Sequence, residues 1–158
     1  MLTLCRDNEM KIVPFRATDA LDLIRSGVIE CGAQVSEPNG SMASLAEFYE
    51  RESMSVTCIL EGKVLFCAMI KPLWPGVAEV AALFDKSFSN HALSGCRAAR
   101  EAMDQVFEIG ELHRLQTTVR VDFAAGVRFA EWMGFEREGL AKRYSHDGVD
   151  AWYYAIVR

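Results

Sequence analysis

One acidic residue lies in the middle of an otherwise apolar segment of the chain. Residues 77–84 read VAEVAALF, and Glu79 is the single charged side chain among them. Burying a carboxylate without a partner is costly, so we expect Glu79 to face a cleft. A carboxylate in a cleft can act as a general base. The alternative is that Glu79 pairs with an arginine at a solvated end of a strand.

A second group of polar residues lies where a long amphipathic helix, residues 92–109, is expected to begin. Free N–H groups and the helix dipole favour an anion at that end. The hydroxyl of Ser94, the backbone N–H of Gly95 and the cation of Arg97 could together hold a phosphate, and glycine lets the backbone approach closely. The alternative is an ordinary capped helix with a surface arginine. The candidate residues at this helix start are therefore Ser94, Gly95 and Arg97.

These side chains need a sheet to position them. Residues 114–121 alternate between apolar and polar side chains, which is typical of a half-buried strand. Residues 123–133 repeat at helical spacing, and Gly134 is the expected C-terminal glycine of that helix. A new extended run begins at Phe135. A strand, a short helix, a glycine and another strand form a crossover unit that must pack on a sheet.

The remaining patterns complete one α+β domain over residues 1–158. The predicted order is β-α-α-β-β-β-α-β-α-β-β, with a mixed, mostly antiparallel central sheet flanked by helices. Half of the 158 residues are hydrophobic, which suffices for one well-packed domain. The expected helices are residues 18–25, 42–52, 92–109 and 123–133. The expected strands are residues 11–15, 55–60, 64–71, 77–84 and 114–121, one from Phe135, and 151–157.

Composition excludes several classes of protein. The net charge of −5 disfavours a nucleic-acid module. The five cysteines are scattered without a Cys-x-x-Cys pair, so neither a disulfide framework nor a zinc site is expected. The first ten residues are too polar for a signal peptide, and no apolar run approaches the ~20 residues of a membrane span. We therefore expect a cytoplasmic protein.

The C-terminal residues carry a resemblance to a known family. Residues 129–139 read FAEWMGFEREG and are followed by Tyr144, Gly148 and the pair Tyr153-Tyr154. Together with Arg114-Leu115 and the predicted element order, this resembles the C-terminal signature of the GNAT superfamily, the acyl-CoA-dependent N-acyltransferases. The similarity runs from about residue 11 to the end of the chain.

The resemblance implies acetyl-CoA as co-substrate. Residues 77–84 and 114–121 would diverge at one end and leave a V-shaped cleft, in which the pantetheine arm bonds to the exposed strand edge. The pyrophosphate would lie at the N-terminus of the helix over residues 92–109. The residues expected to contact the co-substrate are Leu83, Phe84, Asp85, His91, Ser94, Gly95, Cys96, Arg97 and Asp122.

The sequence also departs from the family. The phosphate pattern Gln/Arg-x-x-Gly-x-Gly/Ala falls on His91, Ser94 and Cys96, and neither neighbouring register restores it. Many relatives carry an Asn at the start of the short helix and a Tyr four residues before Gly-Phe, as general acid for the thiolate. Those positions are Phe123 and Ala130 here. Asp122 is the expected substitute for the Asn, and Tyr144, Tyr153 or Tyr154 could approach in place of the Tyr.

Two functional hypotheses result. The first is an N-acetyltransferase that moves an acetyl group from acetyl-CoA to a primary amine of a small molecule or protein by direct attack. The second is an inactive GNAT-like domain for binding or assembly, such as occurs among phage proteins. Glu79 is the preferred base, with His91 and His146 as alternatives; Cys67 and Cys96 rank lower as nucleophiles, because direct attack needs no covalent intermediate. The expected partners are acetyl-CoA and an amine acceptor, without nucleic acid or membrane, and a homodimer stays open.

Overall fold

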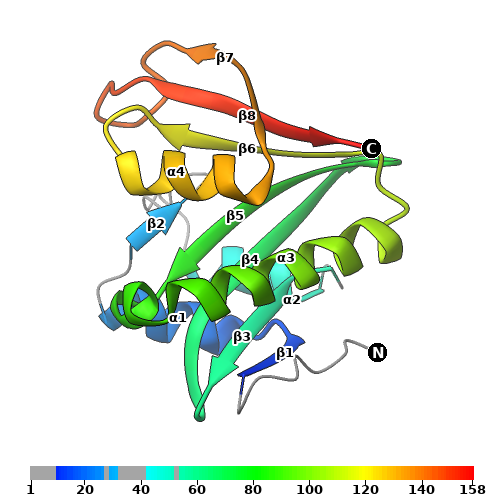
Figure 1. Cartoon of the computed structure of the whole chain (residues 1–158), viewed down its shortest axis with the longest axis vertical. Coiled ribbons are helices and arrows are strands. Elements are labelled where there is room, and N and C mark those ends of the chain that lie inside the picture. The colour runs from blue at the N-terminus through cyan, green and yellow to red at the C-terminus, as the bar shows by residue number, and fades with distance from the viewer. Residues whose placement is uncertain (1–9, 27–28, 32–41, 52–53) are drawn as a thin grey trace.

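The computed structural model describes residues 10–26, 29–31, 42–51 and 54–158. One twisted sheet runs through the molecule, with its strands in the order β1-β3-β4-β5-β6-β8-β7 and with β2 paired to β5 off this path (Figure 1). The strands are β1 (Met10–Pro14), β2 (Ile29–Cys31), β3 (Val56–Leu60), β4 (Lys63–Trp74), β5 (Val77–Phe84), β6 (Arg114–Arg120), β7 (Glu136–Ala141) and β8 (Ala151–Val157). The helices are α1 (Ala17–Ser26), α2 (Met42–Arg51), the 3₁₀ helix η1 (Lys86–His91), α3 (Ala92–Ile109) and α4 (Ala124–Met133).

The sheet forks between β5 and β6. These two strands are parallel and pair only through Val77↔Arg114, Ala78↔Leu115 and Glu79↔Gln116. All other strand pairs are antiparallel. Beyond Glu79, β6 continues along β8 while β5 continues along β4, so the two strands diverge. The mixed, mostly antiparallel sheet predicted from the sequence is therefore confirmed.

Strand β2 lies in this fork. Its three residues pair antiparallel with β5, from Ile29↔Phe84 to Cys31↔Ala82. Because β4 occupies the other edge of β5 along the same residues, β2 must lie on the edge from which β6 has diverged. Figure 1 shows β2 beside β5 on that side. The sequence did not predict this strand.

Each face of the sheet has its own core. Alternate residues of β5 point to opposite faces. Ala78 and Phe84 belong to the larger core under α3 and α4, whereas Ala81 and Leu83 belong to the smaller core, together with residues of α1 and α2. Ala98, Ala102 and Val106 of α3 bury their side chains in the larger core.

Local signals in the sequence account for most element ends. Gly134 adopts the left-handed conformation, φ 95°, and its N–H bonds back to the last turn of α4, as predicted for a C-terminal glycine. Gly62, with φ 79°, makes the tight turn between β3 and β4. In contrast, Trp132 of α4 is a large apolar side chain on the surface and is 42% exposed. Among the described residues, no helix is both long and apolar enough to span a bilayer.

Candidate functional site

Thr117 connects the two branches of the fork. Its hydroxyl donates a hydrogen bond of 2.8 Å to the carbonyl oxygen of Val80, one residue beyond the last pair of β5 and β6. Further along β5, Ala82 to Phe84 pair with β2. The edge of β5 that faces the fork is therefore occupied on both sides of Ala81.

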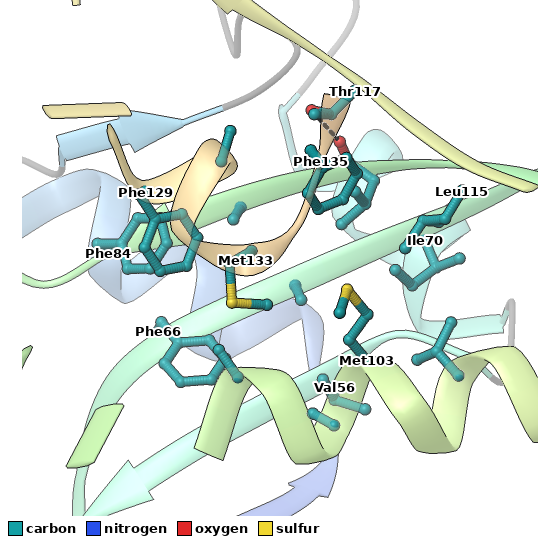
Figure 2. A pocket seen from close by; sticks show the side chains of 17 residues that line it. Val56, Phe66, Ile70, Phe84, Met103, Leu115, Thr117, Phe129, Met133 and Phe135 are labelled. Atoms are coloured by element: carbon teal, nitrogen blue, oxygen red, sulfur yellow. Dashed lines mark hydrogen bonds between the residues drawn. The ribbon is translucent and has the colours of Figure 1, made fainter. Parts of the chain in front are cut away.

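A pocket opens on the α3 side of the fork. It lies between β5, α3 and α4 and is partly open to solvent (Figure 2). Phe84 and Phe129 lie at one end, and Ile70 and Leu115 at the other. Its lining is almost entirely apolar, and Thr117 is the one residue there with a polar side chain. This pocket can take an extended apolar group and little else.

Glu79 lies on the opposite face of the sheet. Its neighbours by alternation, Ala81 and Leu83, contact the α1 and α2 side, so Glu79 also points to that side. Within the described part of the chain, its carboxylate has neither a hydrogen bond nor an ion pair; Lys71 is its cross-strand neighbour on β4. The alternative in which an arginine pairs with Glu79 thus finds no support among these residues.

Tyr49 of α2 lies on the same face of the sheet as Glu79, and the negative charge of Glu79 affects its hydroxyl. The pKa of the Tyr49 hydroxyl is raised, first by burial and second by the negative charge of Glu79. The side chain of Tyr49 belongs to the smaller core with Ala81 and Leu83. The sequence assigned Tyr49 only to an inward helix face, and no local pattern distinguishes it from a core tyrosine.

Strand β6 adds polar groups to the face of Glu79. Gln116 is the direct neighbour of Glu79 across the parallel pair, and its Oε1 accepts a hydrogen bond of 3.1 Å from Arg114. Arg114 also makes a two-pronged ion pair with Glu138. Thr118 is 2% exposed, and its hydroxyl has no hydrogen-bond partner among the described residues. An unsatisfied buried hydroxyl beside the fork suits a polar ligand on this face.

The two consecutive threonines of β6, Thr117 and Thr118, were not predicted as site residues. Because strand side chains alternate, Thr117 points to the apolar pocket and Thr118 to the face of Glu79. The dipeptide Thr117-Thr118 in a strand next to the fork was the available signal. The alternation of residues 114–121 indicates the strand but does not by itself mark these two hydroxyls as site residues.

The start of α3 shows the predicted phosphate residues with other roles. His91 is the N-cap residue but makes no capping hydrogen bond, and the Ser94 hydroxyl donates to the His91 carbonyl at 3.2 Å. Gly95 is buried: a Cβ added there would lie 2.6 Å from the Phe88 ring. Arg97 is exposed, and Cys96 is half-buried, with its pKa raised by burial. The glycine thus has a packing reason that is independent of phosphate.

A cluster of four aromatic rings lies below this helix start. Phe84 contacts Phe88 and Phe129 edge to face, with centroids at 4.7 and 5.0 Å, and Phe66 packs against Phe84 and Phe88. Three of these rings, Phe66, Phe84 and Phe129, line the pocket, and Phe88 of η1 packs behind them. Phe84, predicted to contact the co-substrate, therefore offers its ring to the pocket, whereas its backbone pairs with β2.

The two carboxylates predicted to contact the co-substrate already accept hydrogen bonds from other residues of the chain. The Asp85 carboxylate caps η1 by accepting from the N–H and the hydroxyl of Ser87, which lowers the pKa of Asp85. Asp122 accepts two hydrogen bonds from Arg120, and this pairing lowers the pKa of Asp122. Arg120 also bonds Asp147. Asp122 lies between β6 and α4, as predicted from the sequence. Its carboxylate is already paired with Arg120.

The tyrosines proposed as acids lie on different faces. The Tyr154 hydroxyl, on the α3 side, donates to Glu131 at 2.9 Å and accepts from Arg137. Tyr153 is the cross-strand neighbour of Thr118 and contacts Tyr144 edge to face, with centroids 6.0 Å apart. Tyr153 and Tyr144 therefore share the face of Glu79, whereas Tyr154 is held in an ionic cluster.

The histidines and cysteines are less well placed. His91 and His146 are both exposed. Cys67 is fully buried, and burial raises the pKa of its thiol to about 12, so it stays protonated near neutrality. A protonated, buried thiol is a poor nucleophile.

Solved structures of acetyltransferases share this fold. A GNAT-family acetyltransferase from Bacillus anthracis is 17% identical, with 98% of each chain covered and a TM-score of 0.70. The ribosomal-protein-S18-alanine N-acetyltransferase from Escherichia coli is 18% identical over 94% of this chain and 93% of that chain, with a TM-score of 0.72. Ard1 from Thermoplasma volcanium is 17% identical over 94% of this chain and 97% of that chain, with a TM-score of 0.71. No protein-family model matches, and no curated protein sequence does. The chain thus has the GNAT fold.

The pantetheine arm of an acyl-CoA fits the apolar pocket better than it fits the edge of β5. The apolar pocket fits the carbon skeleton of the arm and of an acyl group. The edge of β5 fits less well, because Ala82 to Phe84 already pair with β2. The Val80 carbonyl also already accepts a hydrogen bond from Thr117. A pantetheine arm that pairs with β5 must therefore displace β2. The residues that would hold the apolar part include Val80, Phe84 and Phe129.

Proposed function

We propose that this protein is an N-acyltransferase that moves an acyl group from acyl-CoA to a primary amine by direct attack. The observation that carries the proposal is the fork of β5 and β6, with an apolar pocket on one face and Glu79 on the other. This arrangement gives the thioester and the amine separate approaches to one point in the sheet. Acetyl-CoA is the donor that the sequence suggests.

Glu79 supplies the proton acceptor in this proposal. The ammonium form of the amine cannot attack, so its proton must pass to a base first, directly or through water. The freed nitrogen then attacks the thioester carbonyl, the new C–N bond forms as the C–S bond breaks, and CoA leaves as a thiolate. The nitrogen gives up a second proton, and the thiolate takes up one. Tyr153 and Tyr144, on the face of Glu79, are the candidate donors to the thiolate.

The second candidate is a GNAT-like domain without catalysis that serves in binding or assembly. The observation that favours it is β2, which occupies the β5 edge at Ala82 to Phe84. The start of α3 also lacks the glycine pattern of the family, and its buried glycine, Gly95, accommodates Phe88 instead. A permanently occupied edge would prevent a pantetheine arm from pairing with β5.

A transfer assay separates the two candidates. The protein is incubated with acetyl-CoA and a panel of primary amines, including a peptide with a free N-terminus, and mass spectrometry follows free CoA and acylated amine. The proposal expects both products in equal amounts, with Glu79→Gln slower by about 10²–10⁴-fold. Glu101→Gln, at an exposed position of α3, is the matched control. Full turnover in Glu79→Gln would remove Glu79 from the mechanism, and no product with any amine favours the second candidate.

A further inference from the structure

The pocket below α3 extends past the fork. Leu115 lines it, although Leu115 lies where β5 and β6 are still paired, at Ala78. On the helix side, the lining runs from Ala99 to Val106, which at 1.5 Å per residue spans on the order of 10 Å. Figure 2 shows Ile70 and Leu115 at the end away from Phe84 and Phe129. The apolar lining thus continues beyond the point where an acyl group would react.

Small side chains keep this space open. Ala68 of β4 and Ala82 of β5 are direct cross-strand neighbours on its floor, and both remain only partly buried although they lie in central strands. Ala99 and Ala102 face them from α3, and Ala130 adds a fifth small residue from α4. Protein interiors are normally close-packed, and unfilled apolar space lowers stability. A core that keeps alanines on facing elements around such a space has the form of a ligand site.

The chemistry of the lining limits the ligand. Thr117 carries the polar side chain of the lining, and its hydroxyl is already bonded to the Val80 carbonyl. A polar or charged ligand would lose its water there without gaining partners. An alkyl chain has no hydrogen bonds to water to give up, and it would bury its surface against Met103, Val106 and Leu115.

We propose that this pocket binds the alkyl chain of an acyl group longer than acetyl, so that the preferred donor is a medium-chain acyl-CoA. This inference rests on the proposed function, because it assumes that a thioester reaches the fork. The chain then continues from the fork toward Ile70 and Leu115. The thioester carbonyl stays near Thr117 and Val80.

A chain-length series tests the inference. Isothermal titration calorimetry measures the affinity of the whole protein for CoA, acetyl-CoA, butyryl-CoA, hexanoyl-CoA and octanoyl-CoA. Each buried methylene should tighten binding by roughly three- to fourfold until the pocket is full. We expect octanoyl-CoA to bind at least about tenfold more tightly than acetyl-CoA, allowing for imperfect burial.

Filling the pocket should abolish this gain. Ala102→Leu places a branched side chain in the cavity, so the advantage of octanoyl-CoA over acetyl-CoA should disappear. Ala130→Val is a smaller filling variant, used should Ala102→Leu fail to fold. Ala125→Leu adds the same bulk as Ala102→Leu at an exposed position of α4 and should leave the series unchanged.

The outcomes separate the two levels of the proposal. A rising series that Ala102→Leu or Ala130→Val flattens supports the inference. Equal affinity for acetyl-CoA and octanoyl-CoA overturns it and leaves the proposed function standing. A rise that both filling variants preserve also overturns it, because the chain then binds elsewhere. Absence of binding by every CoA species overturns the proposed function and the inference together.

Discussion

The hydroxyl of Thr117 donates to the carbonyl oxygen of Val80 at 2.8 Å, directly after the last hydrogen-bonded pair of β5 and β6. The Thr117 side chain thus replaces the next backbone hydrogen bond at the point where the two strands separate. The bond satisfies a backbone acceptor of β5 that lies beyond the residues paired with β6.

Removal of this hydroxyl should destabilise the fold. Thr117→Val keeps the side-chain shape but leaves the Val80 carbonyl without its donor, which costs about 1 kcal/mol. For a domain of this size we expect a melting temperature lower by roughly 2–4 °C, measured by calorimetry. Thr117→Ser retains the hydroxyl and is the control. A melting temperature of Thr117→Val equal to that of the wild type would show that the bond contributes nothing.

Gly95 should serve packing rather than phosphate binding. Alanine is a better helix former than glycine by about 1 kcal/mol, so Gly95→Ala would stabilise an unobstructed helix. Here the added Cβ would lie 2.6 Å from the Phe88 ring, and the overlap should reverse the sign. In a Phe88→Leu background the same change should be neutral or stabilising, as measured by chemical denaturation in a double-mutant cycle. The packing role is refuted if Gly95→Ala stabilises the protein while Phe88 is present.

Weakening β2 should strengthen binding of an acyl-CoA. Successive backbone N–H groups of a strand point to opposite edges, so either Glu30→Pro or Cys31→Pro removes a donor that faces β5. We expect one of these variants to bind acetyl-CoA more tightly than the wild type, as measured by calorimetry, and the other to behave like the wild type. Unchanged affinity in both would mean that β2 does not compete with the co-substrate.

The pairing of Arg120 with Asp122 and Asp147 should make stability depend on pH. Hydrogen bonds from Arg120 lower the pKa of both carboxyl groups in the folded state. Their contribution is therefore present above the unfolded-state pKa, about 3.9, and is lost as the pH falls through the lower folded-state values. Denaturation should find Arg120→Gln less stable than the wild type at pH 6, with the difference vanishing on acidification below about pH 4. Arg128→Gln, an exposed change on α4, is the control; a difference independent of pH would contradict the assignment.

The sequence predicted the architecture because its signals are local. The alternation in β6, the helical spacing of α4 and Gly134 as the left-handed end of that helix each depend on neighbours in the chain. The parallel pairing of β5 and β6 follows from the crossover through α3. These features could be read without knowledge of tertiary contacts.

The missed features are those that depend on distant partners. Strand β2 has three residues, too few for a period, and forms because β5 offers a free edge. Trp132 lies on the surface although it is large and apolar, and the Arg100 guanidinium lies 4.6 Å from its ring centroid. The pocket depends on alanines from different elements that face one another only in the folded chain. Glu79 was recognisable from the sequence; its neighbour Tyr49 and the unpaired Thr118 hydroxyl were not.

In the proposed function, the fork of β5 and β6 binds an acyl-CoA. Thermal unfolding of the full chain with and without acetyl-CoA tests it most directly, because a ligand that binds only the folded state raises the melting temperature. At a concentration about 100 times the dissociation constant, we expect about 2.7 kcal/mol of added stability, and thus a shift of several degrees. An unchanged melting temperature at millimolar acetyl-CoA and millimolar octanoyl-CoA would contradict it.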